Sequence, residues 1–189
     1  MTLAAAPQDL APGLVAGTWK IDPVHSEVGF VVRHLVSKVR GTFDEFEGDI
    51  VIGETLADSS VDVRINPSSV NTKNETRDNH IRSDDFFAVE SHDSITFRGT
   101  GVRQDGDDFY LDGELTVRGV TKPVSLEVEF GGVSPSPFND TRAGFSATTK
   151  INRHDFGVSF NGPVPGSEKA MLGDTVTIHI EVEAVLQTA

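Results

Sequence analysis

The chain lacks the residues and patterns that several kinds of protein require. It has no cysteine among its 189 residues, which excludes disulfides, thiolate metal sites and a cysteine nucleophile. No stretch approaches the roughly 20 apolar residues of a transmembrane helix. Basic residues are few, with 16 Lys and Arg against 29 Asp and Glu, so the net charge is −13 at neutral pH. Such an acidic surface disfavours sequence-independent binding to nucleic acid and to anionic lipid surfaces.

The first 16 residues carry no pattern typical of a structural element. No basic residue precedes Lys20, and the apolar run at 3–6 is too short for the hydrophobic region of a signal peptide. We therefore expect residues 1–16 to be a flexible lead-in and the protein to be cytoplasmic. The remaining residues, 17–189, have the length of one ordinary domain.

Alternation of apolar and polar residues dominates the chain from residue 17 onward. In one C-terminal run, Val176, Ile178 and Ile180 alternate with polar residues. This period of two predicts strands with one buried and one wet face, and such strands are usually antiparallel. Turn signals such as the Asp-Gly pair at 105–106 separate them. The candidate strands are 17–21, 25–35, 38–52, 60–66, 94–103, 108–118, 124–132, 142–151 and 174–187.

Three features favour a closed barrel over a sandwich. Several candidate strands are long, and the strand at 38–52 changes phase between Phe43 and Phe46. A one-residue bulge near Asp44-Glu45 would keep both phenylalanines inside and would bend the strand, as closure requires. Glycines also interrupt the inward-facing positions, as at Gly41 and Gly113, where a strand can bend sharply. The sequence therefore predicts an all-β fold, an extended antiparallel eight-stranded β-barrel, with one short helical segment near 74–88.

The residues expected to face inward predict an apolar interior and leave its filling open. Large members such as Phe30 and Phe145 are mixed with small ones such as Ala147. An eight-stranded barrel has room for its own side chains or for one ligand. The composition does not decide between these two possibilities. The expected inward-facing residues are Val28, Phe30, Val32, Phe43, Val61, Val63, Ile65, Leu115, Val117, Phe130, Phe145, Ala147, Val176 and Ile178.

Motifs for catalysis and metal binding are weak. Asp22, His25 and Ser26 are residue types of a hydrolase triad, but the Gly-x-Ser-x-Gly elbow is missing. His25 and His34 fall on opposite faces of one strand, and the histidines lack the close pairs that mark many metal sites. We expect no catalytic residue, no metal site and no cofactor.

A short charged segment precedes two phenylalanines in the middle of the chain. Arg77 and Asp78 are adjacent, so they cannot pair on one helix face and each needs a partner elsewhere. One interpretation is that these charges fasten the segment to the barrel wall. The other is that Arg77 or His80 meets an anionic head group, because arginine offers a fork of donors suited to phosphate. Phe86 and Phe87 would then line one end of a cavity.

Several motifs taken together resemble the YceI-like family, in order and spacing, over residues 17–187. They are Trp19-Lys-Ile-Asp-Pro-Val-His25-Ser26, Val28-Gly-Phe30-Val-Val-Arg-His34-Leu35, Val39-Arg-Gly41-Thr-Phe43, Ser69-Val-Asn-Thr72, Arg77-Asp-Asn-His80-Ile-Arg-Ser83-Asp-Asp-Phe86-Phe87, Gly113-Glu-Leu115-Thr-Val-Arg-Gly119-Val-Thr-Lys-Pro123 and Arg153-His-Asp155-Phe156-Gly157. The resemblance implies a lipocalin-like barrel whose long apolar pocket holds a polyisoprenoid or similar amphiphilic chain, such as a prenyl diphosphate or a quinone. It also implies a homodimer, and it brings no catalytic residues.

We therefore expect a protein that binds such a lipid inside the barrel as a carrier or store and that is not an enzyme. Two alternatives stay open. One is an enzyme that acts on such a lipid through His34, His80 or His154, and the other is a structural or interaction barrel filled by its own side chains. At the mouth we expect His34, Arg77 and His80 to bind the ligand. We expect the apolar part of the ligand to contact the residues that line the pocket, which are Val28, Phe30, Val32, Phe43, Phe46, Phe86, Phe87, Leu115, Phe145 and Phe156.

Overall fold

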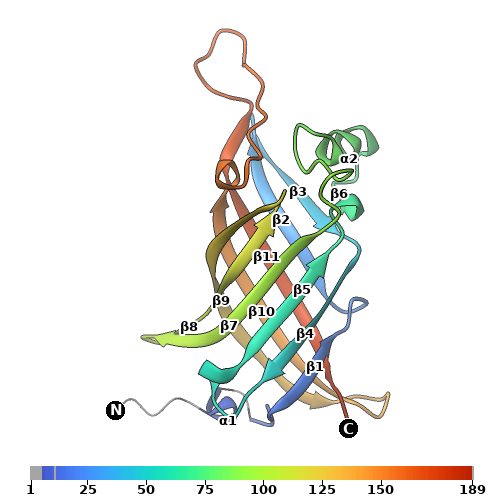
Figure 1. The fold of residues 1–189 in the computed structure, drawn as a ribbon, viewed down its shortest axis with the longest axis vertical. Coiled ribbons are helices and arrows are strands. Elements are labelled where there is room, and N and C mark those ends of the chain that lie inside the picture. Colours follow the sequence, from blue (N-terminus) through green and yellow to red (C-terminus); the bar gives the residue numbers. More distant parts are fainter. Residues whose placement is uncertain (1–5, 11, 189) are drawn as a thin grey trace.

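Antiparallel strands that close on themselves make up most of the computed structural model, which describes residues 6–10 and 12–188 (Figure 1). The strands follow the order β1-β4-β5-β7-β8-β9-β10-β11-β2-β3-β6, and a further pairing of β1 with β11 closes the sheet into a barrel. The elements are α1 (Pro7–Leu10), β1 (Gly17–Ile21), β2 (Glu27–His34), β3 (Ser37–Phe43), β4 (Phe46–Ile52), η1 (Leu56–Asp58), β5 (Ser60–Ile65), η2 (Pro67–Ser69), β6 (Val70–Asn71), α2 (Glu75–Arg82), β7 (Ile95–Asp105), β8 (Asp108–Val117), β9 (Val120–Pro135), β10 (Thr141–Asn152), η3 (Arg153–Phe156) and β11 (Leu172–Leu186).

Three pairs of consecutive strands each continue one another along the barrel wall. Both β1 and β2 pair with β11, so they form one interrupted line beside it. In the same way, β4 pairs with β1 while β3 pairs with β2. Next to them, β5 pairs with β4 and β6 pairs with β3. The eleven strands therefore make eight lines, which confirms the predicted eight-stranded antiparallel barrel.

The predicted phase change at 38–52 is correct, but its predicted form is wrong. A two-residue break at Asp44 and Glu45 separates β3 from β4, in place of a one-residue bulge within a continuous strand. The backbone N–H of Asp44 donates to the Ser69 carbonyl at 3.1 Å, and the N–H of Glu45 donates to Ser69 Oγ at 3.0 Å. The break therefore faces η2, which interrupts the neighbouring line between β5 and β6, and the two irregular segments satisfy each other's polar groups.

Close packing of a ring over a glycine explains one of the small inward-facing positions. Phe30 on β2 is paired directly with Gly41 on β3. A Cβ atom at position 41 would lie 2.4 Å from the Phe30 ring, so no other residue fits there without displacing the ring. Glycine weakens a strand because it has no side chain to pack, and here the neighbouring aromatic ring covers the gap.

The predicted helical segment is helical in its first part. Helix α2 begins after Asn74, whose side-chain oxygen accepts a hydrogen bond from the backbone N–H of Arg77 at 2.9 Å. This is the usual cap of a helix N-terminus. The helix ends at Arg82, and Ser83–Ala88 form turns that carry Phe86 and Phe87 back to the barrel.

A packed apolar cluster fills the end of the barrel that holds α1 and the C-terminal strand end (Figure 1). Trp19 has no exposed surface and Leu14 is 1% exposed. The indole N–H of Trp19 donates to the Val15 carbonyl at 3.1 Å, which holds the segment before β1 against this end. Flexibility of residues 1–16 stays a prediction, and residues 1–5 and 11 lie outside the described part of the chain. Among the described residues, no helix has the length and apolar character needed to cross a bilayer.

Candidate functional site

The barrel is hollow. Its interior holds a cavity of about 750 Å³ lined mainly by apolar side chains. That volume lies within the roughly 300–1,000 Å³ typical of pockets for small ligands. The aromatic residues that the strands contribute to the wall are Phe30, Phe43, Phe46, Phe97, Phe130 and Phe145, and the branched aliphatic ones include Val28, Val32, Val61, Val63, Leu115, Val176 and Ile178. The alternation seen in the sequence therefore places one face of most strands on a shared void.

All the residues expected to contact a ligand lie on the wall of this one cavity. Their role as ligand contacts stays a prediction. The residues are Val28, Phe30, Val32, His34, Phe43, Phe46, Arg77, His80, Phe86, Phe87, Leu115, Phe145 and Phe156.

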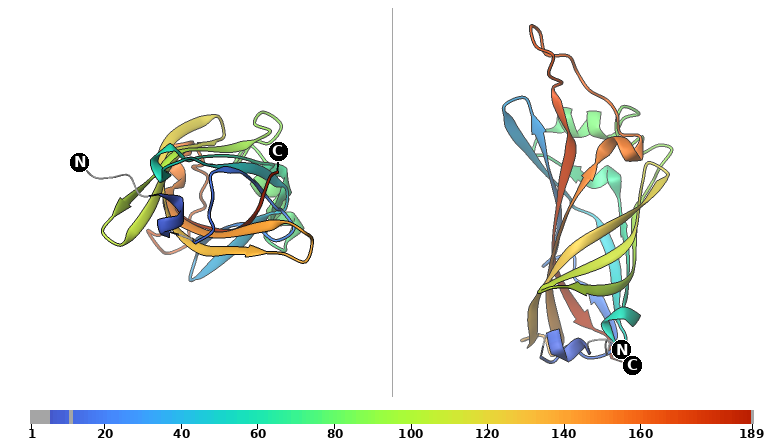
Figure 2. Two further views of the ribbon diagram at one scale, coloured as in Figure 1. Left: turned by 90° about the horizontal axis from the view of Figure 1, so that it is seen from below. Right: turned by 90° about the vertical axis from the view of Figure 1, so that its left-hand side faces the viewer.

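The two ends of the cavity differ. The buried cluster with Trp19 and Leu14 packs at the end that holds α1 and β1, the lower end in Figure 1, while α2 and the segment after η3 stand over the upper end (Figures 1 and 2). Three rings meet there: His80 packs against Phe86 and Phe160, with centroids 5.1 and 4.8 Å away, and the two phenylalanines are 5.3 Å apart. All three line the cavity. We call this group the mouth cluster.

Arg77 and Asp78 find their partner in a single residue, Thr72. The Asp78 carboxylate accepts hydrogen bonds from the Thr72 backbone N–H at 2.9 Å and from its hydroxyl at 2.6 Å. The Arg77 guanidinium donates to the same hydroxyl and to the Thr72 carbonyl, both at 2.7 Å. These bonds fasten the start of α2 to β6. They use two of the five donors of the guanidinium, and Arg77 also lines the cavity.

Arg153 holds the segment that carries Phe160, a role that no sequence pattern predicts. It is a buried arginine that lines the cavity. Its guanidinium donates to the carbonyls of Val158 and Phe160, both at 2.8 Å, and to that of Gly173 at 2.9 Å. Burial lowers the pKa of Arg153, and Asp174, 3.9 Å away, opposes that shift. A charged residue directly after a strand is typical of a solvated turn, so only the fold reveals its buried contacts.

The three histidines of the enzyme alternative are not brought together. His34 and His80 line the cavity, whereas His154 is absent from its wall. His80 Nε2 lies 2.7 Å from Asp85 Oδ2, and His154 Nε2 lies 2.9 Å from Asp174 Oδ1. Both Asp85 and Asp174 are therefore held by a histidine at the upper end of the barrel.

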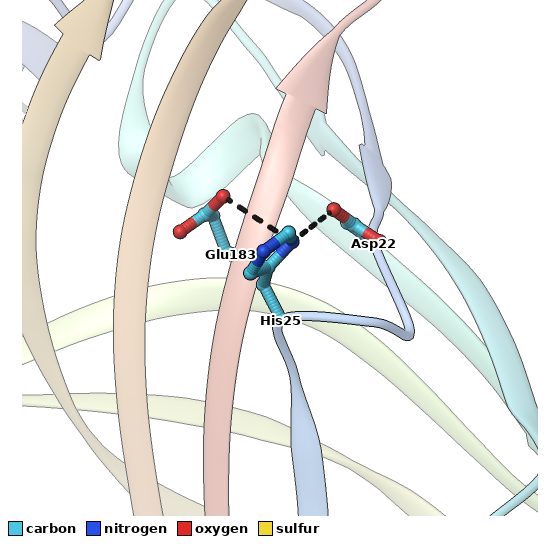
Figure 3. Close-up of side chains that lie close together, drawn as sticks. All are labelled: Asp22, His25 and Glu183. Carbon is cyan, nitrogen blue, oxygen red and sulfur yellow. Dashed lines mark hydrogen bonds and ion pairs between the residues drawn. The ribbon is translucent and has the colours of Figure 1, made fainter. Parts of the chain in front are cut away.

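The Asp22, His25 and Ser26 motif forms a structural charge network outside the cavity (Figure 3). His25 Nδ1 lies 2.8 Å from Asp22 Oδ2 and 4.0 Å from Glu183 Oε1. The hydrogen bond with His25 is the largest of several causes that lower the pKa of Asp22 to about 2. The Ser26 hydroxyl bonds to the backbone of Glu183 and not to His25, so it lacks the contact that would activate a nucleophile.

Arg142 argues against a metal ion in that network. Ligand atoms of Asp22, His25 and Glu183 lie within 4.8 Å of one another, as a metal site would require. The Arg142 guanidinium, however, donates to both carboxylates, at 2.8 Å for Asp22. Because this cation already occupies oxygen atoms of both carboxylates, the network ties the β1–β2 connection to β10 and β11.

Comparison with known proteins identifies the family. The family model for the YceI-like domain matches residues 19–184. The chain belongs to the YceI-like family. The UPF0312 protein SA2479 of Staphylococcus aureus is 40% identical over 168 residues, which cover 86% of this chain and 94% of that protein. The resemblance found in the sequence is thus confirmed over nearly the whole barrel.

Solved structures share the fold of this YceI-like protein. The YCEI protein of Campylobacter jejuni is 34% identical, with a TM-score of 0.69, and the match covers 82% of this chain and 90% of that one. BcnA of Burkholderia cenocepacia gives a TM-score of 0.74 at 19% identity, covering 86% and 98% of the two chains. A structure described as a polyisoprenoid binding domain from Saccharophagus degradans gives 0.65 at 16% identity, covering 92% and 100%. The last two show the YceI-like barrel fold alone.

Proposed function

We propose that this protein binds a polyisoprenoid or a similar long-chain amphiphilic lipid, such as a prenyl diphosphate or an isoprenoid quinone, inside its barrel, as a carrier or store. The observation that carries the proposal is the hollow apolar interior, about 750 Å³ in volume and packed shut at the Trp19 end. The structural neighbour from Saccharophagus degradans is described as a polyisoprenoid binding domain, which agrees with it.

The physical basis of binding is the removal of a hydrocarbon chain from water. Each Å² of apolar surface that enters the cavity contributes about 25 cal/mol, so a dry wall of phenylalanine and valine supplies the affinity. The packed lower end limits the length of the hydrocarbon chain that the cavity can hold. The head group would stay at the upper end, where His34, Arg77 and His80 line the cavity and offer donors to a phosphate or a carbonyl.

The alternatives have less support. A barrel filled by its own side chains would leave no void of this size, so the cavity argues against it. For an enzyme, the cavity would need a positioned acid or base near the reacting atoms. His80 packs against the apolar rings of Phe86 and Phe160, and His34 has no side-chain hydrogen bond among the described residues to orient it. We therefore propose a binding protein and not an enzyme.

Native mass spectrometry of gently purified protein tests the proposal. We expect an added mass that organic extraction releases and identifies as an isoprenoid or another long-chain lipid. Protein stripped of lipid should then take up an added prenyl diphosphate or isoprenoid quinone with one molecule per barrel. Protein that is always empty and takes up neither probe would contradict the proposal.

Two further parts of the sequence-based expectation are also proposals. One is a homodimer, which rests on the family resemblance, and light scattering after size-exclusion chromatography measures it directly. The other is a cytoplasmic location, which fractionation of the source cells measures. Neither affects the argument for the cavity, because the residues of one chain suffice to form it.

A further inference from the structure

The turn between β2 and β3 exposes two adjacent aliphatic side chains to water. Val36 is 102% exposed, and Leu35 is also exposed. Leu35 has a φ of 51°, in the left-handed region that glycine or asparagine adopts more readily than leucine. The turn geometry therefore does not favour an apolar residue at this position. An exposed leucine held there against its backbone preference indicates a contact outside the chain.

Basic residues surround this turn in an otherwise acidic protein. Residues 33–40 and 161–171 together hold four of the 16 basic residues and one of the 29 acidic ones. Arg33, Lys38 and Arg40 are exposed, and none of them forms an ion pair within the described residues. The turns 53–59 and 104–108, elsewhere on the barrel, carry five acidic residues and no basic one. The charge of the molecule is thus unevenly distributed.

This apolar and basic surface lies at the upper end of the cavity. The backbone N–H of Leu35 donates to the Met171 carbonyl at 2.8 Å, so the turn is tied to the segment before β11. Met171 and His34, the residue before Leu35, both line the cavity. Figure 2 shows the turn and the segment after η3 projecting together from that end. We call residues 33–40 and 161–171 the rim.

We propose that the rim docks the barrel on an anionic lipid bilayer, with Leu35 and Val36 in the interfacial layer and Arg33, Lys38 and Arg40 on phosphate groups. Its purpose rests on the proposed function, because docking there points the cavity mouth at the membrane from which a lipid would enter. Apolar burial and electrostatic attraction together drive such peripheral binding. The acidic remainder of the surface is repelled by the same bilayer. The α2 side of the same end is acidic too, with Glu75, Asp84 and Asp85. Only the rim side can therefore face the bilayer, so the general repulsion expected from the net charge becomes an orienting force.

Vesicle flotation tests the docking without any bound ligand. The full chain is mixed with vesicles of phosphatidylcholine alone or of phosphatidylcholine with phosphatidylglycerol. We expect binding to the anionic vesicles only, and less of it as salt is added. The double variant Lys38→Gln and Arg40→Gln should weaken vesicle binding about fivefold for each charge removed. Val36→Ser should also weaken it, because the apolar contact is lost.

Matched variants control for net charge and for exposed apolar surface. The double variant Arg98→Gln and Arg103→Gln removes two exposed charges from β7, and we expect it to leave vesicle binding unchanged. Val24→Ser changes a valine that is 82% exposed in the β1–β2 connection and should also have no effect. A further variant, Val36→Trp, should show a blue shift in fluorescence with anionic vesicles, against the constant background of buried Trp19.

Three results would overturn the docking proposal. The first is a full chain that does not float with anionic vesicles. The second is that the rim variants bind these vesicles as well as the unchanged chain does. The third is that Val36→Ser changes the oligomeric state of a protein that binds no vesicles. The last would make the rim an interface between two copies. Failure of the proposed function is a separate outcome: a chain that floats but takes up no prenyl ligand keeps the docking and loses the lipid cargo.

Discussion

The ring of Phe160 meets the ring of His80 edge-on, with 4.8 Å between the centroids and 78° between the planes. Phe160 follows η3, whereas His80 lies on α2, so the contact joins two segments from distant parts of the chain. Phe86 packs against both rings. Because the three rings line the cavity at the end away from Trp19, a ligand that enters from this end passes them.

Replacing Phe160→Ala should speed ligand release. An aromatic pair contributes about 0.5–1.5 kcal/mol beyond its buried area, so we expect the release rate to rise about two- to tenfold. Stopped-flow transfer of a fluorescent polyene lipid from the protein to acceptor vesicles measures that rate. Phe138→Ala is the control, since this exposed ring lies outside the cavity wall. Equal release rates for Phe160→Ala and the unchanged chain would show that the mouth cluster does not limit exit.

Filling part of the cavity with a larger side chain should weaken the binding of long lipid ligands more than that of short ones. Ala147 lines the cavity, and its neighbour Thr148 is exposed on the other face of β10. Ala147→Trp places an indole where the lipid chain would lie. Because each methylene kept out of the cavity costs about 0.8 kcal/mol, we expect the longest prenyl ligand to bind more than about tenfold more weakly. Shorter ligands should lose less affinity.

The matched control for the filling experiment is Thr148→Trp, which adds the same ring to the outside. Its affinity for long and short ligands should equal that of the unchanged chain in a titration followed by native mass spectrometry. If both tryptophan variants lose affinity equally, or if Ala147→Trp binds all chain lengths as before, the ligand does not occupy the barrel interior.

The segment before β1 should contribute to stability through Leu14. This side chain is buried beside Trp19, and truncation of a buried leucine costs about 2–5 kcal/mol. Leu14→Ala should therefore lower the free energy of unfolding by that amount. Urea unfolding followed by the fluorescence of Trp19, the only tryptophan, measures it. Val15→Ala, at an exposed neighbour, should change the stability by less than about 0.5 kcal/mol. Equal stabilities of the two variants would mean that Leu14 does not hold this end closed.

Periodicity predicted the regular part of this molecule well. Alternating residues such as Val176 and Ile178 predict strands because one face of each strand must be buried, and those faces do line a common interior. The odd spacing of Phe43 and Phe46 likewise revealed a break in the strand. Its length could not be read from the sequence, because it depends on Ser69, which satisfies the backbone from the neighbouring line.

The irregular parts depend on contacts that no local pattern encodes. Leu14 opens the short apolar run Leu14-Val15-Ala16, and nothing in the sequence distinguishes it from Val15, which is exposed. The strand β6 has only two residues, too few to show a period. Arg153 belongs to one of the motifs shared with the family, but its three carbonyl partners come from chain segments that only the closed barrel brings to it. The wall of the site was thus predictable, and the closures of its two ends were not.

The charge network around Asp22 should make stability depend on pH. The pKa of Asp22 is about 2 in the folded protein and about 3.9 in an unfolded chain. Its carboxylate therefore favours the folded state at pH values above about 4, and this contribution disappears as the pH falls toward about 2. Asp22→Asn removes the charge. Allowing for the partial exposure of the side chain, we expect it to lower the free energy of unfolding by about 1–2 kcal/mol at neutral pH.

The pH profile separates the charge of Asp22 from its shape. Urea unfolding of the unchanged chain and of Asp22→Asn between about pH 5 and pH 2 should show a gap in stability that is fully present near pH 5 and closes by about pH 2. Asp107→Asn is the control, because this exposed turn residue has no ion pair within the described residues, and its gap should be near zero throughout. A gap for Asp22→Asn that persists unchanged in acid would mean that hydrogen-bond geometry, and not the pairing of its charge with His25 and Arg142, stabilises the β1–β2 connection.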